Sequence, residues 1–186
     1  MPRTVRRGTE QVFANLPPNH LCTGKILLID RVDRQILAEL EENGRLTVTE
    51  LAARINLSVS PCHRRLRELE RTRAIRGYRA IVDPVAVGLG FQALVFASLH
   101  QADRETVATF EDALLTIPQV LQAQRLFGDP DYLLQVVAAD LPDFQRFYDE
   151  RLATLPGLRR LTSTIVMKDV VDHRPLTAIS LPRRHR

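Results

Sequence analysis

The residues best suited to do chemistry lie between positions 58 and 79, a stretch with seven arginines and two glutamates. Arg64, Arg67 and Arg71 follow one another at spacings of three and four, which places them on one side of a helix with Ser60. Arginine presents a planar fork of N–H donors that pairs with phosphate or with the edge of guanine. The stripe predicts contacts to an anionic partner such as DNA. The alternative is a solvated face of mixed charge.

The opposite side of this helix is apolar. Cys62, Leu66 and Leu69 fall on one stripe, so Cys62 is predicted to be a packed core residue rather than a redox sensor. His63 lies beside the arginine stripe and is interpreted as a groove contact rather than a metal ligand. Glu68 and Glu70 are expected to lie off that stripe, which leaves the outer face basic.

Two shorter helices must hold this one in place. Asp30 can cap a helix with apolar residues at helical spacing, and Asn43-Gly44 ends it, with Gly44 expected in the left-handed conformation. Thr47 and Glu50 form a capping box that opens a second helix reaching position 55. After a turn of about three residues, Ser58 or Ser60 caps the third helix. This order predicts a helix-turn-helix unit.

The second half of the chain alternates strands and helices. The β-branched run 75–84 predicts a strand or wing, and 85–90 a hinge with two glycines. Beyond it, strands are expected at 91–99, 120–127, 132–138 and 160–170, and helices at 104–117 and 141–154. The order β-α-β-β-α-β is the ferredoxin-like arrangement. The fold class is therefore α+β, a winged helix-turn-helix domain followed by a ferredoxin-like domain.

Length, charge and cysteine count exclude several classes of protein. The chain has 186 residues, a net charge of +4 and only two cysteines, which cannot form a disulfide framework or a zinc site. No apolar run is long enough to cross a bilayer, and no secretory leader is recognisable, so a cytoplasmic protein without a membrane partner is expected. Residues 26–84 carry a net +2 and residues 85–176 a net −4, so an anionic partner suits the first half only.

These patterns divide the chain into five segments. They are a flexible extension at 1–25, a helix-turn-helix domain at 26–75, a wing and hinge at 76–90, an effector-binding and oligomerisation domain at 91–175, and a basic tail at 176–186.

From about residue 29 to 175 the chain resembles the leucine-responsive/asparagine regulator (Lrp/AsnC) family of prokaryotic transcription factors. The motifs that carry the resemblance are 30–37 (DRVDRQIL), 43–45 (NGR), 57–70 (LSVSPCHRRLRELE), 75–78 (IRGY), 83–84 (DP), 128–132 (GDPDY), 155–157 (LPG) and 165–167 (IVM). One departure is Arg73, which stands where the family usually has a glycine before the wing.

The resemblance implies a DNA-binding dimer that associates further, often into octamers, and a roughly palindromic operator. Arg64 and Arg67 are then the candidate base readers, because arginine pairs bidentately with guanine. The other expected DNA contacts, most of them to phosphates, are Ser58, Ser60, His63, Arg71 and Arg76.

The resemblance also implies an amino-acid effector bound at an interface between dimers. Residues expected to line this site are Gly128, Asp129, Asp131, Tyr132, Leu141, Thr164, Ile165 and Val166. A carboxylate such as Asp131 suits the effector's ammonium group, and backbone N–H groups of a glycine turn suit its carboxylate. The alternative is a tight hairpin whose aspartates satisfy their own backbone.

Two other functions are compatible with the same architecture. The arrangement also resembles siroheme decarboxylases, in which case His100 would be the residue to suspect, but the five histidines form no motif. An architectural DNA-binding protein with little sequence preference is the second alternative. No catalytic residue, metal site or cofactor is predicted, and the chain is expected not to be an enzyme.

Overall fold

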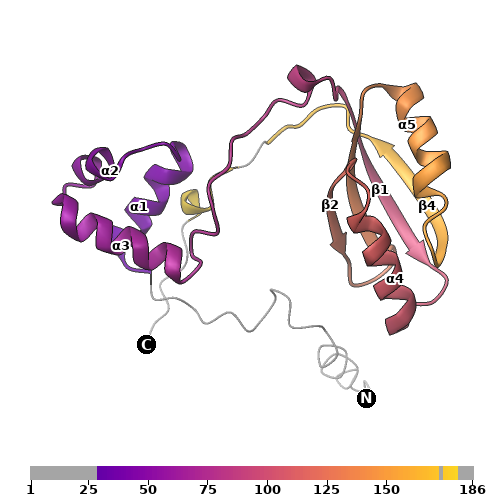
Figure 1. Ribbon diagram of the computed structural model, residues 1–186, viewed down its shortest axis with the longest axis horizontal. Helices are drawn as coiled ribbons and strands as arrows, with labels where there is room; N and C mark the ends of the chain where they lie inside the picture. The colour runs from indigo at the N-terminus through magenta and orange to yellow at the C-terminus, as the bar shows by residue number, and fades with distance from the viewer. Residues whose placement is uncertain (1–28, 172–173, 180–186) are drawn as a thin grey trace, which may run out of the picture. The chain divides into compact units, whose positions relative to one another are not determined.

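A computed structural model describes residues 29–171 and 174–179, and their contacts group them into two units (Figure 1). The first unit contains residues up to Arg79 together with the segment from Arg174 onward, and the second runs from Ala80. The predicted extension at 1–25 and the end of the basic tail, 180–186, lie outside the described residues. Among the described residues, no helix is long and apolar enough to span a bilayer.

Three helices build the first unit, as predicted: α1 (Arg31–Glu42), α2 (Val48–Arg54) and α3 (Val59–Arg71). Each helix is preceded by a polar N-cap residue, and both α1 and α2 open with a capping box. In α1 the side chain of Asp30 accepts the backbone N–H of Asp33 at 2.8 Å. The core between the helices is formed by Ile36, Leu51, Ala52, Ile55, Cys62 and Leu69.

Two local predictions in this unit were wrong. The expected left-handed conformation of Gly44 is absent; instead Asn43 ends α1 in an extended conformation, and its side chain accepts the N–H of Arg45. The predicted strand at 75–84 does not form either: residues 76–83 join no β-ladder within the described part of the chain. An apolar β-branched run needs a neighbouring strand for its N–H and C=O groups, and here it has none.

The second unit is an antiparallel sheet in the order β2-β3-β1-β4. Its elements are β1 (Phe91–Leu99), α4 (Arg104–Leu115), β2 (Val120–Arg125), β3 (Tyr132–Ala138), α5 (Leu141–Phe147) with a π-helical turn at Tyr148–Leu152, and β4 (Leu158–Ile165). This is the predicted β-α-β-β-α-β order, with β3 central as its continuous apolar sequence indicates.

Both helices lie on the same side of this sheet (Figure 1). Ala93, Val95 and Ala97 of β1 alternate toward them and are fully buried, and Phe110 of α4 packs into the same core. The other side of the sheet carries no helix among the described residues. The last strand begins at Leu158 and ends at Ile165, rather than spanning 160–170, because its ladder with β1 ends where Ile165 pairs with Ala93.

Candidate nucleic-acid interface and effector site

The apolar side of helix α3 packs against the other two helices and holds α3 in place. Cys62 is fully buried and Leu69 is 5% exposed, so the cysteine is a core residue as predicted. Burial raises the pKa of the Cys62 thiol, which keeps it protonated and unreactive. On the flank of the helix, the Arg65 guanidinium donates to Asp30 at 2.7 Å and to Asp33 at 2.8 Å. One arginine thus bridges two carboxylates at the start of α1.

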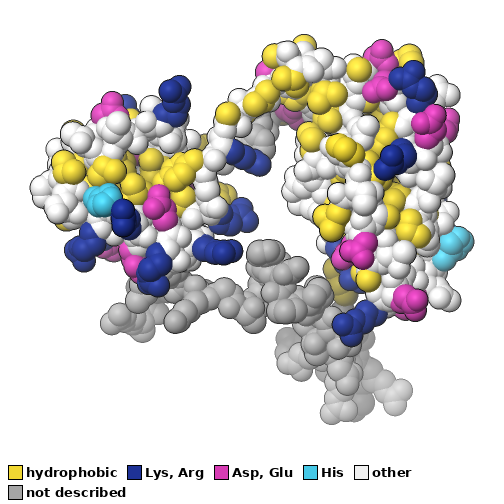
Figure 2. Space-filling view, in the orientation of Figure 1, with side chains coloured by type: hydrophobic (Ala, Val, Ile, Leu, Met, Phe, Trp, Pro, Cys, Tyr) yellow, Lys and Arg dark blue, Asp and Glu magenta, His cyan; other side chains and the backbone are white. Residues whose placement is uncertain are grey.

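The outer side of α3 is polar and exposed. Ser58, Ser60, His63, Arg64 and Arg67 all face solvent. No ion pair engages Arg64 or Arg67 in the part of the chain that the structure describes. Figure 2 shows Lys and Arg side chains gathered on one side of the first unit. Two arginines one helical turn apart are therefore available to an external partner.

The start of α3 is also open. Ser58 is the N-cap residue, but its side chain makes no capping hydrogen bond within the described structure. The first N–H groups of a helix have no partner inside the helix, and they carry the positive end of the helix dipole. An anion such as a phosphate can bind to them and to the nearby hydroxyls.

Arg71 is less available than its place on the stripe suggests. It forms an ion pair with Glu68, three residues earlier on α3, and this contact raises the pKa of Arg71. The expectation that Glu68 lies off the arginine stripe was wrong. Glu68 pairs with Arg71, and it lines a shallow pocket together with Arg64 and Arg65. At 100° per residue, positions 64, 68 and 71 fall within one sector of a helix.

Arg76 follows α3 in the extended segment and is exposed. This segment is attached to α3 by Tyr78, whose hydroxyl donates to Glu70 at 3.0 Å. Burial and this hydrogen bond raise the pKa of Tyr78 to about 12, so the phenol stays protonated. The contact keeps Arg76 beside the end of α3.

In the second unit, the loop between β2 and β3 is folded back on the end of β1. The Leu126 N–H donates to the Asp131 carbonyl at 2.7 Å and closes the loop, which includes Gly128 at φ +132. Asp131 accepts the backbone N–H of Leu99 at 2.8 Å, and Asp129 accepts the hydroxyl of Ser98 at 2.9 Å. Both carboxylates thus have protein partners across the sheet, not within their own turn.

Tyr132 points away from this loop into the core. Its side chain is 2% exposed, packs against Phe110 in a tilted arrangement at a centroid distance of 4.7 Å and donates to Glu111. Burial, and then the contact with Glu111, raise its pKa. The geometry gives Tyr132 a structural role behind the turn.

The remaining effector candidates lie at the other end of the sheet. Ile165 pairs with Ala93 near the start of β1, whereas the loop at 128–131 contacts Ser98 and Leu99 at its end. Six residues of strand separate the two ends by roughly 20 Å. Leu141, Thr164 and Ile165 are exposed and Val166 is half-buried. Within one copy of the chain, the predicted effector residues therefore form two separate groups.

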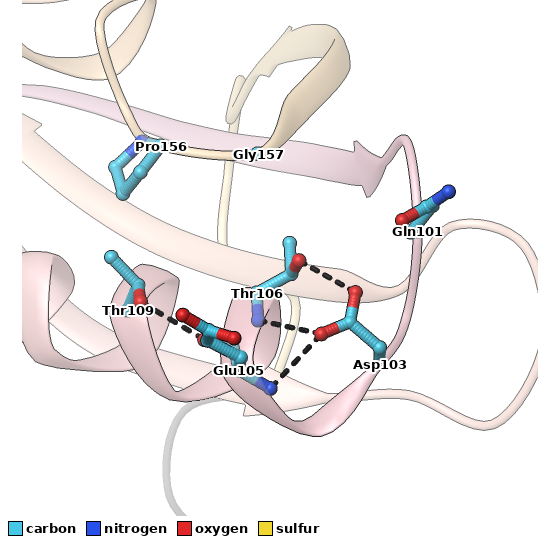
Figure 3. Close-up of a pocket in the computed structure, with 7 residues that line it drawn as sticks. All are labelled: Gln101, Asp103, Glu105, Thr106, Thr109, Pro156 and Gly157. Atoms are coloured by element: carbon cyan, nitrogen blue, oxygen red, sulfur yellow. Dashed lines mark hydrogen bonds between the residues drawn. The ribbon is translucent and has the colours of Figure 1, made fainter.

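A third region carries a shallow pocket of ≈ 400 Å³ between the start of α4 and the corner before β4 (Figure 3). Its polar lining is already engaged: Asp103 accepts the N–H groups of Glu105 and Thr106 and the Thr106 hydroxyl. Gly157, at φ +72, approaches so closely that a Cβ there would lie 2.5 Å from Thr106 Cγ2. The pocket is thus bounded by the N-terminal cap of α4 and by the close-packed corner at Gly157, and none of the predicted site residues lines it.

The sequence alone did not identify the contacts made by Arg65 and Ser98. Arg65 lies between the two stripes of α3, and its partners are more than 30 residues away in the chain. Ser98 is inside an apolar strand and is 2% exposed. A buried serine in an apolar strand was the one available signal, because buried hydroxyls need a partner. Elsewhere, no group of His, Cys, Asp or Glu able to hold a metal occurs among the described residues, and His100 is exposed.

Comparisons with known proteins match both units. A winged helix-turn-helix DNA-binding family model matches residues 29–76, and a model described as the Lrp/AsnC ligand binding domain matches residues 92–176. The chain is 35% identical over 143 residues to the Bkd operon transcriptional regulator of Pseudomonas aeruginosa, covering 77% of this chain and 94% of that protein. It is 37% identical over 145 residues to the leucine-responsive regulatory protein of Rhizobium meliloti, covering 77% and 92%.

The fold has solved counterparts as well. One is a crystal structure of a transcriptional regulator from Neisseria meningitidis in complex with L-methionine. It superposes with a TM-score of 0.75 at 37% identity and covers 79% of this chain and 95% of that chain. Both units of the present chain therefore recur together in proteins that the match covers over most of their length.

Proposed function

The chain belongs to the Lrp/AsnC family of transcription regulators, and we propose that it binds a roughly palindromic operator through α3 and responds to an amino acid. The observation that carries the DNA part of this proposal is the pair of exposed arginines, Arg64 and Arg67, on a helix whose other sides are fixed. A rigid helix with available forked donors is what reading the major groove requires.

The other exposed groups suit the DNA backbone. The start of α3 offers N–H groups with the hydroxyls of Ser58 and Ser60, while His63 is exposed on the helix and Arg76 follows it. Arg71 would have to exchange Glu68 for a phosphate. Solvent screens an exposed ion pair of this kind, so the exchange costs little free energy.

Replacing Arg64 or Arg67 with alanine tests the role in base recognition. Each substitution should reduce the preference for operator over single-base mismatches at particular positions, by about 1–3 kcal/mol, because a bidentate pairing with guanine is removed. The measurement is competition binding with a set of duplexes, each altered at one base pair.

The matched control is Arg34→Ala, which removes an exposed arginine from the side of α1 opposite Ile36. It should leave the pattern of preferences unchanged. If Arg64→Ala and Arg67→Ala weaken binding equally on every duplex, these arginines contact phosphates and the readout lies elsewhere.

Symmetry suggests how two copies would present α3 to DNA. The helix-free side of the sheet carries Leu94, Phe96 and Leu133, half-buried apolar residues on neighbouring strands. We propose that this face forms a two-fold interface in a homodimer, with further association into larger oligomers. Two-fold symmetry would match a palindromic operator with half-sites about one helical turn apart.

The effector part of the proposal draws on the two separate groups of candidate residues. Gly128, Asp129 and Asp131 lie at one end of the sheet, and Leu141 and 164–166 at the other. A single ligand could touch both groups only where two copies meet. The name of the Rhizobium meliloti relative and the methionine in the Neisseria meningitidis complex support an amino acid as the ligand class.

Substitution of Asp131 separates its two possible roles. Asp131→Asn keeps an oxygen that can accept the Leu99 N–H but removes the charge that would bind an ammonium group. The variant should therefore bind DNA as the original chain does, and lose any change in oligomer size on addition of an amino acid. Sedimentation with each of the twenty amino acids measures this.

Asp131→Ala serves as the comparison, because it removes both the charge and the acceptor. A normal effector response in Asp131→Asn, combined with no response in Asp131→Ala, would make Asp131 a structural residue of the loop. The effector would then bind elsewhere.

We propose a regulator rather than an enzyme or an architectural protein, and thus a cytoplasmic location beside prokaryotic DNA. The enzyme alternative centres on His100, which is exposed after β1. Titration with siroheme would give a shifted absorption spectrum if that alternative held. An architectural protein would bind all duplexes alike, with a steep dependence on salt.

A further inference from the structure

Helix α3 carries two carboxylates, Glu68 and Glu70, and their surroundings differ. Glu70 accepts the hydroxyl of Tyr78 at 3.0 Å, so it holds the segment that follows the helix. Glu68 follows Arg64 by one helical turn and lines a shallow pocket with it, and it pairs with Arg71 three residues later. A negative charge therefore lies among the arginines on the side of α3 that we propose binds DNA.

This position is unfavourable for a carboxylate on electrostatic grounds. DNA phosphates repel it, so Glu68 weakens binding to every duplex unless it gains a specific contact. The fold gains little from it either, because the Glu68 side chain is 57% exposed and its ion pair with Arg71 is a surface contact. Neither stability nor general affinity for DNA explains a glutamate at this position.

The Glu68 carboxylate is ionised and can only accept hydrogen bonds. Its two oxygens accept the Nε and Nη2 groups of Arg71, and this contact lowers the pKa of Glu68. A carboxylate offers about four lone-pair sites, so part of its capacity is open to a further donor. All of it is open once Arg71 exchanges Glu68 for a phosphate. In contact with DNA, Glu68 then needs a donor from the base edges.

Few groups in the major groove can supply that donor. Guanine presents two acceptors there and thymine an acceptor and a methyl group, whereas the amino groups of cytosine and adenine donate. Adenine also places the acceptor N7 beside its amino group, and N7 repels a carboxylate, so cytosine is the favoured partner. Any other base leaves the carboxylate desolvated without a donor, which adds a penalty against the wrong sequence.

We propose that Glu68 is a specificity-determining residue of α3, which accepts a hydrogen bond from the N4 amino group of a cytosine in the operator. This inference rests on the proposed DNA binding through α3. Four residues of a helix rise by about 6 Å, and successive base pairs are about 3.4 Å apart. The cytosine should therefore lie within about two base pairs of the guanine that Arg64 contacts.

Selection of duplexes from a random pool by Glu68→Gln tests this pattern of donors and acceptors. Glutamine donates as well as accepts, and its amide pairs with N6 and N7 of adenine. The variant should select adenine where the original chain selects cytosine, and the other positions should stay the same. In competition binding, the original chain should prefer cytosine to adenine at this position by about tenfold, and Glu68→Gln should lose or reverse that preference.

Glu70→Gln is the matched control. It makes the same change of charge two positions away on the same helix, and it keeps an acceptor for the Tyr78 hydroxyl. Both variants should bind a duplex of arbitrary sequence somewhat more tightly than the original chain, since each loses a negative charge. Only Glu68→Gln should change the selected sequence.

Arg71→Ala separates direct recognition by Glu68 from an indirect effect. It should weaken binding to all duplexes but keep the preference for cytosine, because Glu68 makes the contact with the base. Loss of that preference in Arg71→Ala would make Glu68 a positioning residue for Arg71 and would overturn the proposal.

The selected sequences also distinguish this proposal from the one on which it rests. If Arg64→Ala and Arg67→Ala change the selected sequence and Glu68→Gln does not, base reading by α3 stands and the role of Glu68 is refuted. If the original chain selects no sequence at all, both proposals fail.

Discussion

At the scale of single residues, Arg73 is held in a conformation that costs free energy. It follows the end of α3 with φ +58, in the left-handed region that side chains other than glycine rarely adopt. The same position of α2 is Asn56 at φ 55, and asparagine tolerates this region better. The turn after α3 therefore requires a glycine-like residue, although the sequence places an arginine there.

Arg73→Gly should raise the free energy of unfolding of the first unit by about 0.5–1 kcal/mol. The relief of the left-handed strain exceeds the extra chain entropy of glycine in the unfolded state. Urea unfolding of the two proteins measures the difference. Arg67→Gly, inside α3, is the control and should lower stability by about 1 kcal/mol, and an equal decrease in Arg73→Gly would contradict the strain at this turn.

The sequence predicts only in part which arginine side chains can bind an external partner. Helical spacing correctly placed Arg64 and Arg67 on the outer side, because period and burial follow from local sequence. The engagement of Arg65 with Asp30 and Asp33 is a tertiary contact, and no pattern in residues 58–79 contains that information. Arg71 and Glu68, in contrast, have the i,i+3 spacing of neighbours on one helix, so helical spacing could have indicated their ion pair.

At the scale of elements, α1 and α3 are joined by the bridge from Arg65 to Asp30 and Asp33. The Asp33 backbone N–H and the Arg65 side chain hold the pKa of Asp30 below its usual value of 3.8. A carboxyl whose pKa is lowered by folding stabilises the protein above its ordinary pKa, and this contribution disappears as the pH falls below that value.

Arg65→Ala should therefore destabilise the first unit by about 1 kcal/mol at neutral pH, because the bridge is partly buried but reachable by water. The difference from the original chain should shrink as the pH falls below 3.8. Thermal unfolding followed by circular dichroism at several pH values tests both statements. A difference that is independent of pH would mean that Arg65 acts by packing and not by charge.

The elements also show where sequence patterns stop being informative. Helix starts could be predicted because Asp30, Thr47 and Asp140 cap helices by local contacts. The strand expected at 160–170 is shorter because its ladder with β1 ends at Ile165. The strand expected at 75–84 does not form because no strand pairs with it among the described residues. A strand pattern in the sequence indicates that a segment can pair, whereas the neighbouring strand determines how long the resulting strand is.

At the scale of the whole molecule, the proposed interface with another copy of the chain is the helix-free face of the sheet. Phe96→Glu places a charge in the middle of the helix-free face, opposite Leu133 of β3. Dimer affinity should fall by about 30-fold or more, equivalent to about 2 kcal/mol, since an aromatic side chain that the proposed interface would bury is replaced by a charge. Analytical ultracentrifugation over a range of protein concentrations measures the change.

Leu115→Glu is the control for this experiment, because Leu115 of α4 is 86% exposed on the opposite side of the unit. It should leave the dimer intact. If Leu115→Glu dissociates the dimer and Phe96→Glu does not, the interface involves the helices instead of the open sheet face.

The arrangement of distant segments could not be predicted from the chain. The basic tail was recognised from its composition, but its attachment to Glu41 joins residues 135 positions apart. Likewise, the motif residues expected around the effector proved to lie at two ends of one sheet. Local sequence determines which residues can bind a ligand; the fold and the assembly determine which of them can do so together.

The most direct test of sequence-specific regulation through α3 is selection of duplexes from a random pool by the full chain. We expect enrichment of a roughly palindromic sequence with half-sites about one helical turn apart, containing guanine at contacted positions. The Arg64→Ala/Arg67→Ala variant should fail to enrich it while retaining binding to DNA in general. Recovery of the pool without any enriched sequence by the original chain would contradict sequence-specific binding by α3.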